Sequence, residues 1–92
     1  MRILVTFRST HAALEAESAL MIAGLKPEIL PVPRELSTSC GLCIGLEMPD
    51  HQRIAALLGE WQIDYGAIYA VEHTDNQRHY QVIFENSAPN EG

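Results

Sequence analysis

The sequence predicts an α+β fold of the ferredoxin-like βαββαβ type, with two helices on one face of a four-stranded antiparallel sheet. Three observations support this fold class. Four short apolar segments have the β-branched content or the alternation typical of strands, and two segments have helical periodicity. Their order over residues 2–71 is strand, helix, strand, strand, helix, strand. A chain of 92 residues can bury one core but not two.

The first half of the pattern begins with a β-branched, apolar segment at residues 2–7, which predicts a buried strand. Ser9 or Thr10 can cap the helix that follows, because a hydroxyl oxygen accepts a hydrogen bond from an unpaired backbone N–H group. From His11 to Ala23, alanines recur at helical spacing and would let this helix lie close to a sheet. Gly24 then suits a left-handed C-cap.

Two strands are expected next, at residues 28–32 and 42–46. The first is bounded by prolines, and the second alternates Leu42, Ile44 and Leu46 with smaller or polar residues. Because successive side chains of a strand point to opposite faces, Cys43 should face away from these three residues, on the second face of the sheet.

The second helix and the fourth strand complete the predicted fold. Asp50 is the expected cap of the helix, and Ile63 to Val71 alternate as a strand. Four apolar residues at spacings of three and four form one face of the helix: Ile54, Leu57, Leu58 and Trp61.

The C-terminal part has weaker patterning. We expect a polar turn at 73–78 and an extra strand at 79–85, which pairs either with the fourth strand or with a second copy of the chain. The end, 86–92, is expected to be disordered. The predicted organisation is therefore a ferredoxin-like domain at 1–72 followed by an extension at 73–92.

Composition excludes several function classes. Twelve acidic and six basic residues give a formal charge of -6, which would repel nucleic-acid phosphates on average. No apolar run approaches the length of a membrane span. The start of the chain is better explained as a strand than as a signal peptide, so we expect a cytoplasmic location. There the two cysteines would be mostly reduced.

The segment 31–43 holds both cysteines beside an arginine, Arg34. In the predicted fold, the loop that contains Cys40 lies at the same sheet edge as the start of the first helix. A helix N-terminus and nearby cations favour a thiolate. The residues that we therefore expect around Cys40 are Arg8, Ser9, Thr10, His11, Arg34, Ser39 and Gly41.

Cys43 and the arginines also have ordinary structural explanations. Cys43 is a good candidate for a small buried apolar residue, and the arginines for solvated surface charges. The neighbouring Glu47, Asp50 and His51 have a generic spacing that does not predict a metal site.

The sequence resembles the DUF3343 family, whose members are described as selenium/sulfur carrier-like proteins. The resemblance spans residues 2–71, with matching runs at 5–17 and 24–25, and is strongest in the loop Pro33-Arg34-Glu35-Leu36-Ser37-Thr38-Ser39-Cys40-Gly41. It implies a reactive cysteine at Cys40 that takes up sulfur or selenium. Cys43 stands where relatives have a small or apolar residue, and the strand at 79–85 lies outside the usual extent of the family.

The leading hypothesis is a stoichiometric carrier rather than a turnover enzyme. Cys40 would receive sulfur or selenium as a persulfide or selenosulfide from a donor such as a cysteine desulfurase and deliver it to an acceptor protein, with no cofactor. Cys43 is a candidate resolving thiol. The alternatives are a metal- or redox-binding module that uses Cys40 and Cys43, and a non-catalytic oligomeric or regulatory module that pairs through 79–85.

Overall fold

The computed structural model describes residues 2–36, 40–47 and 50–86. The expected disorder at 87–92 lies outside these residues. In chain order the elements are β1 (Arg2–Phe7), α1 (Thr10–Ile22), β2 (Glu28–Pro31), the short 3₁₀ helix η1 (Arg34–Leu36), β3 (Leu42–Leu46), α2 (His51–Glu60), β4 (Tyr65–Thr74) and β5 (Gln77–Glu85). None of the helices within the described part of the chain is long and apolar enough to cross a membrane.

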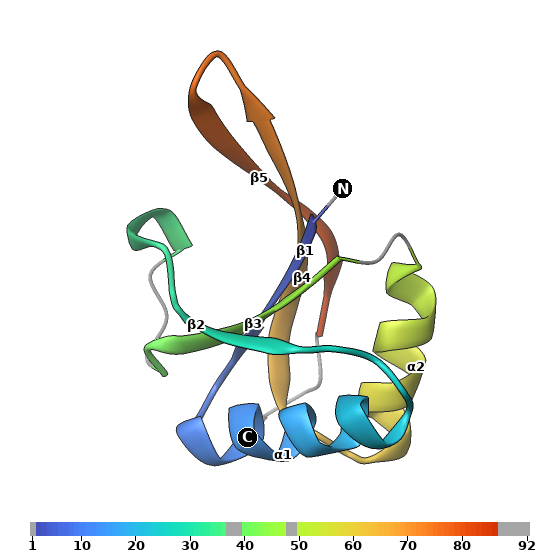
Figure 1. The fold of residues 1–92 in the computed structure, drawn as a ribbon. Coiled ribbons are helices and arrows are strands. Elements are labelled where there is room, and N and C mark those ends of the chain that lie inside the picture. The colour runs from blue at the N-terminus through green and yellow to red at the C-terminus, as the bar shows by residue number, and fades with distance from the viewer. Residues whose placement is uncertain (1, 37–39, 48–49, 87–92) are drawn as a thin grey trace.

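The strands form one sheet in the order β2-β3-β1-β4-β5, and every neighbouring pair is antiparallel. The prediction of an α+β fold with two helices and an antiparallel sheet is therefore confirmed. The sheet has five strands, because β5 pairs with β4 as a hairpin that projects beyond the other strands (Figure 1). The extra strand was predicted to pair either with the fourth strand or with a second copy of the chain, and in the structure it pairs with the fourth strand.

The sheet has one face in the core, and in the part of the chain that the structure describes no α-helix covers the other face. Ile3 and Val5 of β1 and Ile44 of β3 pack with residues of both helices in one apolar cluster. The intervening residues, such as Leu4 and Cys43, belong to the opposite face, which we call the far face. This division follows from the alternation of side chains along a strand.

The helices begin and end where local chemistry predicts. The Ser9 side chain accepts a hydrogen bond from the backbone N–H of Ala12 at 3.0 Å and caps α1, and Asp50 caps α2 through the N–H of Arg53. After α1, Gly24 has a φ of 88°, which a residue with a Cβ rarely adopts. The buried side of α1 is formed largely by small residues: Ala12, Ala13, Ala16, Ala19 and Leu20.

The β4–β5 hairpin differs from its predicted form. β4 continues through Thr74, and the turn is confined to Asp75 and Asn76, with φ values of 51° and 64°. The expected polar turn at 73–78 was therefore too long. Positive φ at both central residues is typical of the two-residue hairpin turn whose twist matches that of the strands.

Candidate functional site

Cys40 lies in the irregular segment between η1 and β3, three residues before Cys43. It is a free thiol of intermediate burial. Its side chain packs against the apolar cluster that the helices share with β1 and β3. Cys40 is thus partly exposed but supported by the core, which is compatible with a reactive thiol in a defined position.

The backbone on either side of Cys40 is shaped by Gly41. This exposed glycine has a φ of 78°, and its carbonyl oxygen accepts a hydrogen bond from the N–H of Val32 at 3.1 Å. The bond ties the end of the cysteine loop to the segment that follows β2. The turn at Gly41 therefore leads the chain from Cys40 directly into β3.

The start of α1 holds four of the residues predicted to surround Cys40. The hydroxyl of Ser9 is used as a cap, Thr10 is the exposed first residue of the helix, and the exposed imidazole of His11 lies 4.0 Å from Glu15. Arg8 donates hydrogen bonds to the carboxylate of Asp64 at 2.8 Å and to the backbone carbonyl of Asn86 at 2.9 Å. In this arrangement the Arg8 guanidinium joins the start of β4 to the end of β5.

Two further predicted residues flank the loop. Arg34 is an exposed residue of η1, and among the described residues no side-chain hydrogen bond joins it to Cys40. Ser39 lies outside the described residues. A cationic environment for the Cys40 thiol therefore remains a prediction.

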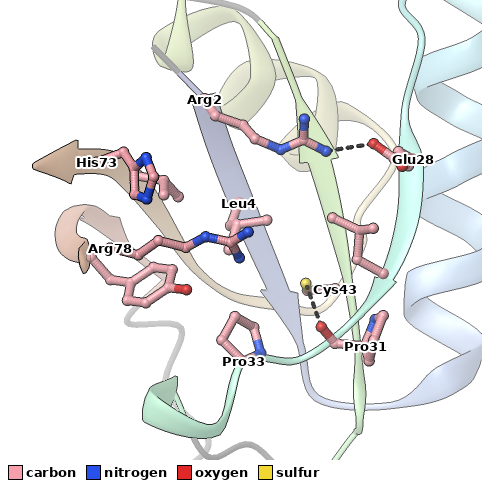
Figure 2. A pocket seen from close by; sticks show the side chains of 11 residues that line it. Arg2, Leu4, Glu28, Pro31, Pro33, Cys43, His73 and Arg78 are labelled. Carbon is pink, nitrogen blue, oxygen red and sulfur yellow. Dashed lines mark hydrogen bonds and ion pairs between the residues drawn. The ribbon is translucent and has the colours of Figure 1, made fainter. Parts of the chain in front are cut away.

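Cys43 lies on the far face, as the alternation of β3 predicts. Its side chain is 0% exposed, and its Sγ lies 3.7 Å from the carbonyl oxygen of Pro31, within hydrogen-bond range for sulfur (Figure 2). Burial raises the pKa of the Cys43 thiol above its ordinary value; the positive charge of Arg2 opposes this shift, and the Cys40 thiolate adds to it. Cys43 is consequently held as a neutral thiol near pH 7.

Cys43 forms part of the floor of a pocket of about 500 Å³ on the far face (Figure 2). The pocket is lined by residues of β1, of the strands on either side of it and of the loop after β2. These residues are Arg2, Leu4, Glu28, Leu30, Pro31, Pro33, Cys43, Val71, His73, Arg78 and Tyr80. Sequence reasoning missed it. The signal that could have found part of it is parity, because Arg2 and Leu4 share a face of β1 and Cys43 shares that face on β3.

Arg2 forms one wall of this pocket and is fixed by two carboxylates. It donates to Glu28 of β2 and, at 2.8 Å, to Glu47 just after β3. Arg2 thereby links three strands at one end of the sheet. Among the described residues, no group of three or more His, Cys, Asp or Glu side chains is arranged to hold a metal ion.

The sequence of this chain is similar to a known protein family and to a curated protein. Residues 2–70 match the profile of the family described as "Putative Se/S carrier protein-like". A 51-residue stretch is 37% identical to the uncharacterized protein YtiA of Escherichia coli strain K12, covering 55% of this chain and 60% of that protein. The match thus spans about three-fifths of the length of that curated relative. No solved structure matches the chain.

Proposed function

We propose that this chain, which belongs to the family of Se/S carrier-like proteins, carries sulfur or selenium on the thiolate of Cys40 and passes it to an acceptor protein. The family match covers three-quarters of the chain and includes the whole described cysteine loop. The antiparallel order β2-β3-β1-β4 supports a ferredoxin-like assignment for the first four strands. That scaffold presents the loop just before the start of β3.

The observation that carries the proposal is the difference between the two thiols. Cys40 is partly exposed, in an irregular segment next to Gly41, whose φ is 78°. Cys43 is 0% exposed. A protein-to-protein transfer needs a sulfur atom that a partner can approach, and the thiolate is the species that attacks. Cys40 meets the access requirement better than Cys43.

The transfer itself requires no cofactor. The Cys40 thiolate attacks the outer sulfur of a donor persulfide, R–S–SH; the S–S bond of the donor breaks, a new S–S bond forms at Cys40, and R–S⁻ leaves. The acceptor thiolate then repeats the same step on the Cys40 persulfide. Selenium follows the same route with a selenosulfide. A cysteine desulfurase is the expected class of donor.

Arg34 is the cation that we propose to assist at Cys40. It is exposed in η1 within the same loop, whereas Arg8 is engaged by Asp64 and Asn86. A positive charge near the sulfur would stabilise both the attacking thiolate and the persulfide anion. Arg34→Gln should therefore slow loading at Cys40 without unfolding the chain.

Mass spectrometry of the intact protein tests the carrier proposal. The chain is incubated with a cysteine desulfurase and cysteine, and the added mass of one sulfur atom is measured for wild type, Cys40→Ser and Cys43→Ser. We expect sulfur on wild type and on Cys43→Ser, and none on Cys40→Ser. No added sulfur on wild type, or equal labelling of Cys40→Ser and wild type, would reject the proposal.

Self-association through β5 is a second proposed role, compatible with the first. β5 has a strand on one side only within the described residues, and its Val82 and Phe84 side chains are 48% and 45% exposed. An open strand edge with apolar side chains is suited to pairing with a second copy. Sedimentation analysis of wild type and of Val82→Lys checks this: the variant should be monomeric at concentrations where wild type forms dimers, and a wild type that stays monomeric contradicts it.

A further inference from the structure

The pocket on the far face takes no part in the carrier chemistry proposed for Cys40. Its volume of about 500 Å³ lies within the range of pockets that hold small organic ligands. The apolar part of its lining, which we call its floor, includes Leu4, Leu30 and Val71 together with the thiol of Cys43. A bare inorganic ion would leave this apolar floor uncovered, so the shape favours a ligand with an apolar body.

The charges around the pocket indicate the sign of the ligand. Arg2 is already compensated by Glu28 and Glu47. In residues 2–36, 40–47 and 50–86, no carboxylate forms an ion pair with Arg78, whose guanidinium points into the pocket in Figure 2. Among the described residues Arg78 is therefore an uncompensated cation, on a chain whose formal charge is -6. Such a group is suited to bind an anion.

The same charges limit how negative the ligand can be. Glu28 lines the pocket and would repel a dianion such as a phosphate monoester more strongly than a carboxylate. The Cys43 thiol at the floor is neutral because burial raises its pKa, so it adds no negative charge. A single carboxylate opposite Arg78 is the charge that this lining accommodates.

The wall that carries Arg78 comes from a part of the chain outside the family match. Of the eleven lining residues, four lie after residue 70, where that match ends: Val71, His73, Arg78 and Tyr80. The β4–β5 hairpin supplies them all. The pocket is consequently a feature that the hairpin adds to the matched domain, and its ligand need not be shared across the family.

From these observations we infer that the far-face pocket binds a small organic monocarboxylate. The guanidinium of Arg78 would hold the carboxylate, and the apolar body would cover Leu4, Leu30 and Val71. This site is independent of the transfer at Cys40 and goes beyond the proposed carrier function.

Titration of the full-length protein with phenylbutanoate, followed by two-dimensional NMR of the backbone amides, tests the inference. Phenylbutanol and phenylbutyl phosphate serve as the neutral and dianionic analogues. Arg78→Gln removes the proposed contact at an exposed position, and Arg53→Gln, an exposed arginine of α2, is the matched control. A second measurement is the alkylation rate of Cys43 in a Cys40→Ser protein, with and without phenylbutanoate.

We expect saturable shifts at Leu4, Leu30 and Cys43, and slower alkylation of Cys43 when the ligand is present. Affinity for phenylbutanoate should fall about tenfold or more in Arg78→Gln and stay unchanged in Arg53→Gln, because a hydrogen bond to a charged group is lost. Both analogues should bind more weakly. Any of three results would overturn the inference: binding that does not saturate up to the solubility limit, phenylbutanol binding as tightly as phenylbutanoate, or an unchanged affinity in Arg78→Gln.

Discussion

Cys40 and Cys43 are three positions apart in the chain, yet Cys40 packs against the core on the helix side while Cys43 lines the pocket on the far face. The positive φ of Gly41 and the start of β3 at Leu42 separate the two environments. One thiol is partly exposed and the other is buried and neutral, so their chemistry should differ in ways that experiments can measure.

The first prediction concerns alkylation rates. In native protein near neutral pH, iodoacetamide should modify Cys40 in a Cys43→Ser protein about tenfold or more faster than Cys43 in a Cys40→Ser protein, because Cys43 is 0% exposed and its pKa is raised. In concentrated urea the two rates should converge. Equal rates in the native proteins would show that the burial of Cys43 does not protect it.

The second prediction concerns stability at alkaline pH. A thiol whose pKa is raised on folding binds its proton more tightly in the folded state, so its stabilising effect is complete below the unfolded pKa and is lost as pH rises through the folded value. Wild type should therefore lose stability above about pH 8.5, the ordinary thiol pKa. Cys43→Ala should start lower but decline less steeply. Urea denaturation from pH 7 to 10 measures both slopes, and parallel slopes would contradict the prediction.

Thr6 supports an irregularity at the centre of the sheet. Its buried hydroxyl oxygen accepts from the N–H of Ala67 at 3.1 Å, where the pairing of β1 with β4 shifts register between Val5 and Phe7. Thr6→Val keeps the shape but leaves a buried N–H unpaired, which should cost about 1–3 kcal/mol of unfolding free energy. Thr6→Ser should lose less. Calorimetry measures the unfolding free energy of both variants. Equal losses in Thr6→Val and Thr6→Ser would mean that the hydroxyl is unimportant.

Gly45 leaves space for the Arg2 side chain. A Cβ at this position would lie 2.6 Å from a guanidinium nitrogen of Arg2 and 3.0 Å from Leu30. Gly45→Ala should displace Arg2 from Glu28 and destabilise the chain by about 1 kcal/mol or less, because the side-chain ends can move and the ion pair is exposed. In an Arg2→Ala background the same substitution should cost less. A double-mutant cycle measured by urea denaturation tests this coupling; additive effects would rule it out.

The last prediction concerns the boundary expected at residue 72. Phe84 of β5 stacks on Tyr65, with ring centroids 6.4 Å apart, and Arg8 binds the carbonyl of Asn86. A chain ending at residue 72 loses both contacts and the pairing of β4 with β5. It should unfold at lower urea concentration than the full chain, as followed by circular dichroism. An unchanged midpoint would show that residues 1–72 are independently stable.

Local patterns predicted most of the fold. The strand at 2–7 has the predicted bounds, and Ser9, Gly24 and Asp50 act as the helix ends that their chemistry favours. The hairpin was harder to predict. Residues 72–79 are exposed on both faces, so alternation gives no apolar signal there and the end of β4 resembles a turn.

The candidate site was only partly predictable for a related reason. Cys43 belongs to a regular strand, and parity gave its face correctly. Cys40 lies in an irregular segment, where no periodicity tells which way a side chain points. The pocket was missed because it combines distant residues such as Arg2 and Arg78, and which strands are neighbours cannot be read from any single segment.

The central place of β1 has a consequence for how the chain acquires its structure during synthesis. β1 leaves the ribosome before the other strands of the sheet, but its hydrogen-bonded neighbours are β3 and β4. One edge of β1 can pair once residues 42–46 of β3 have emerged, but the other edge stays unpaired until residues 65–71 of β4 follow. The nascent chain thus cannot complete its sheet early, and contacts so distant in sequence make for slow folding. The β4–β5 hairpin, closed by a two-residue turn, can form as soon as it is made.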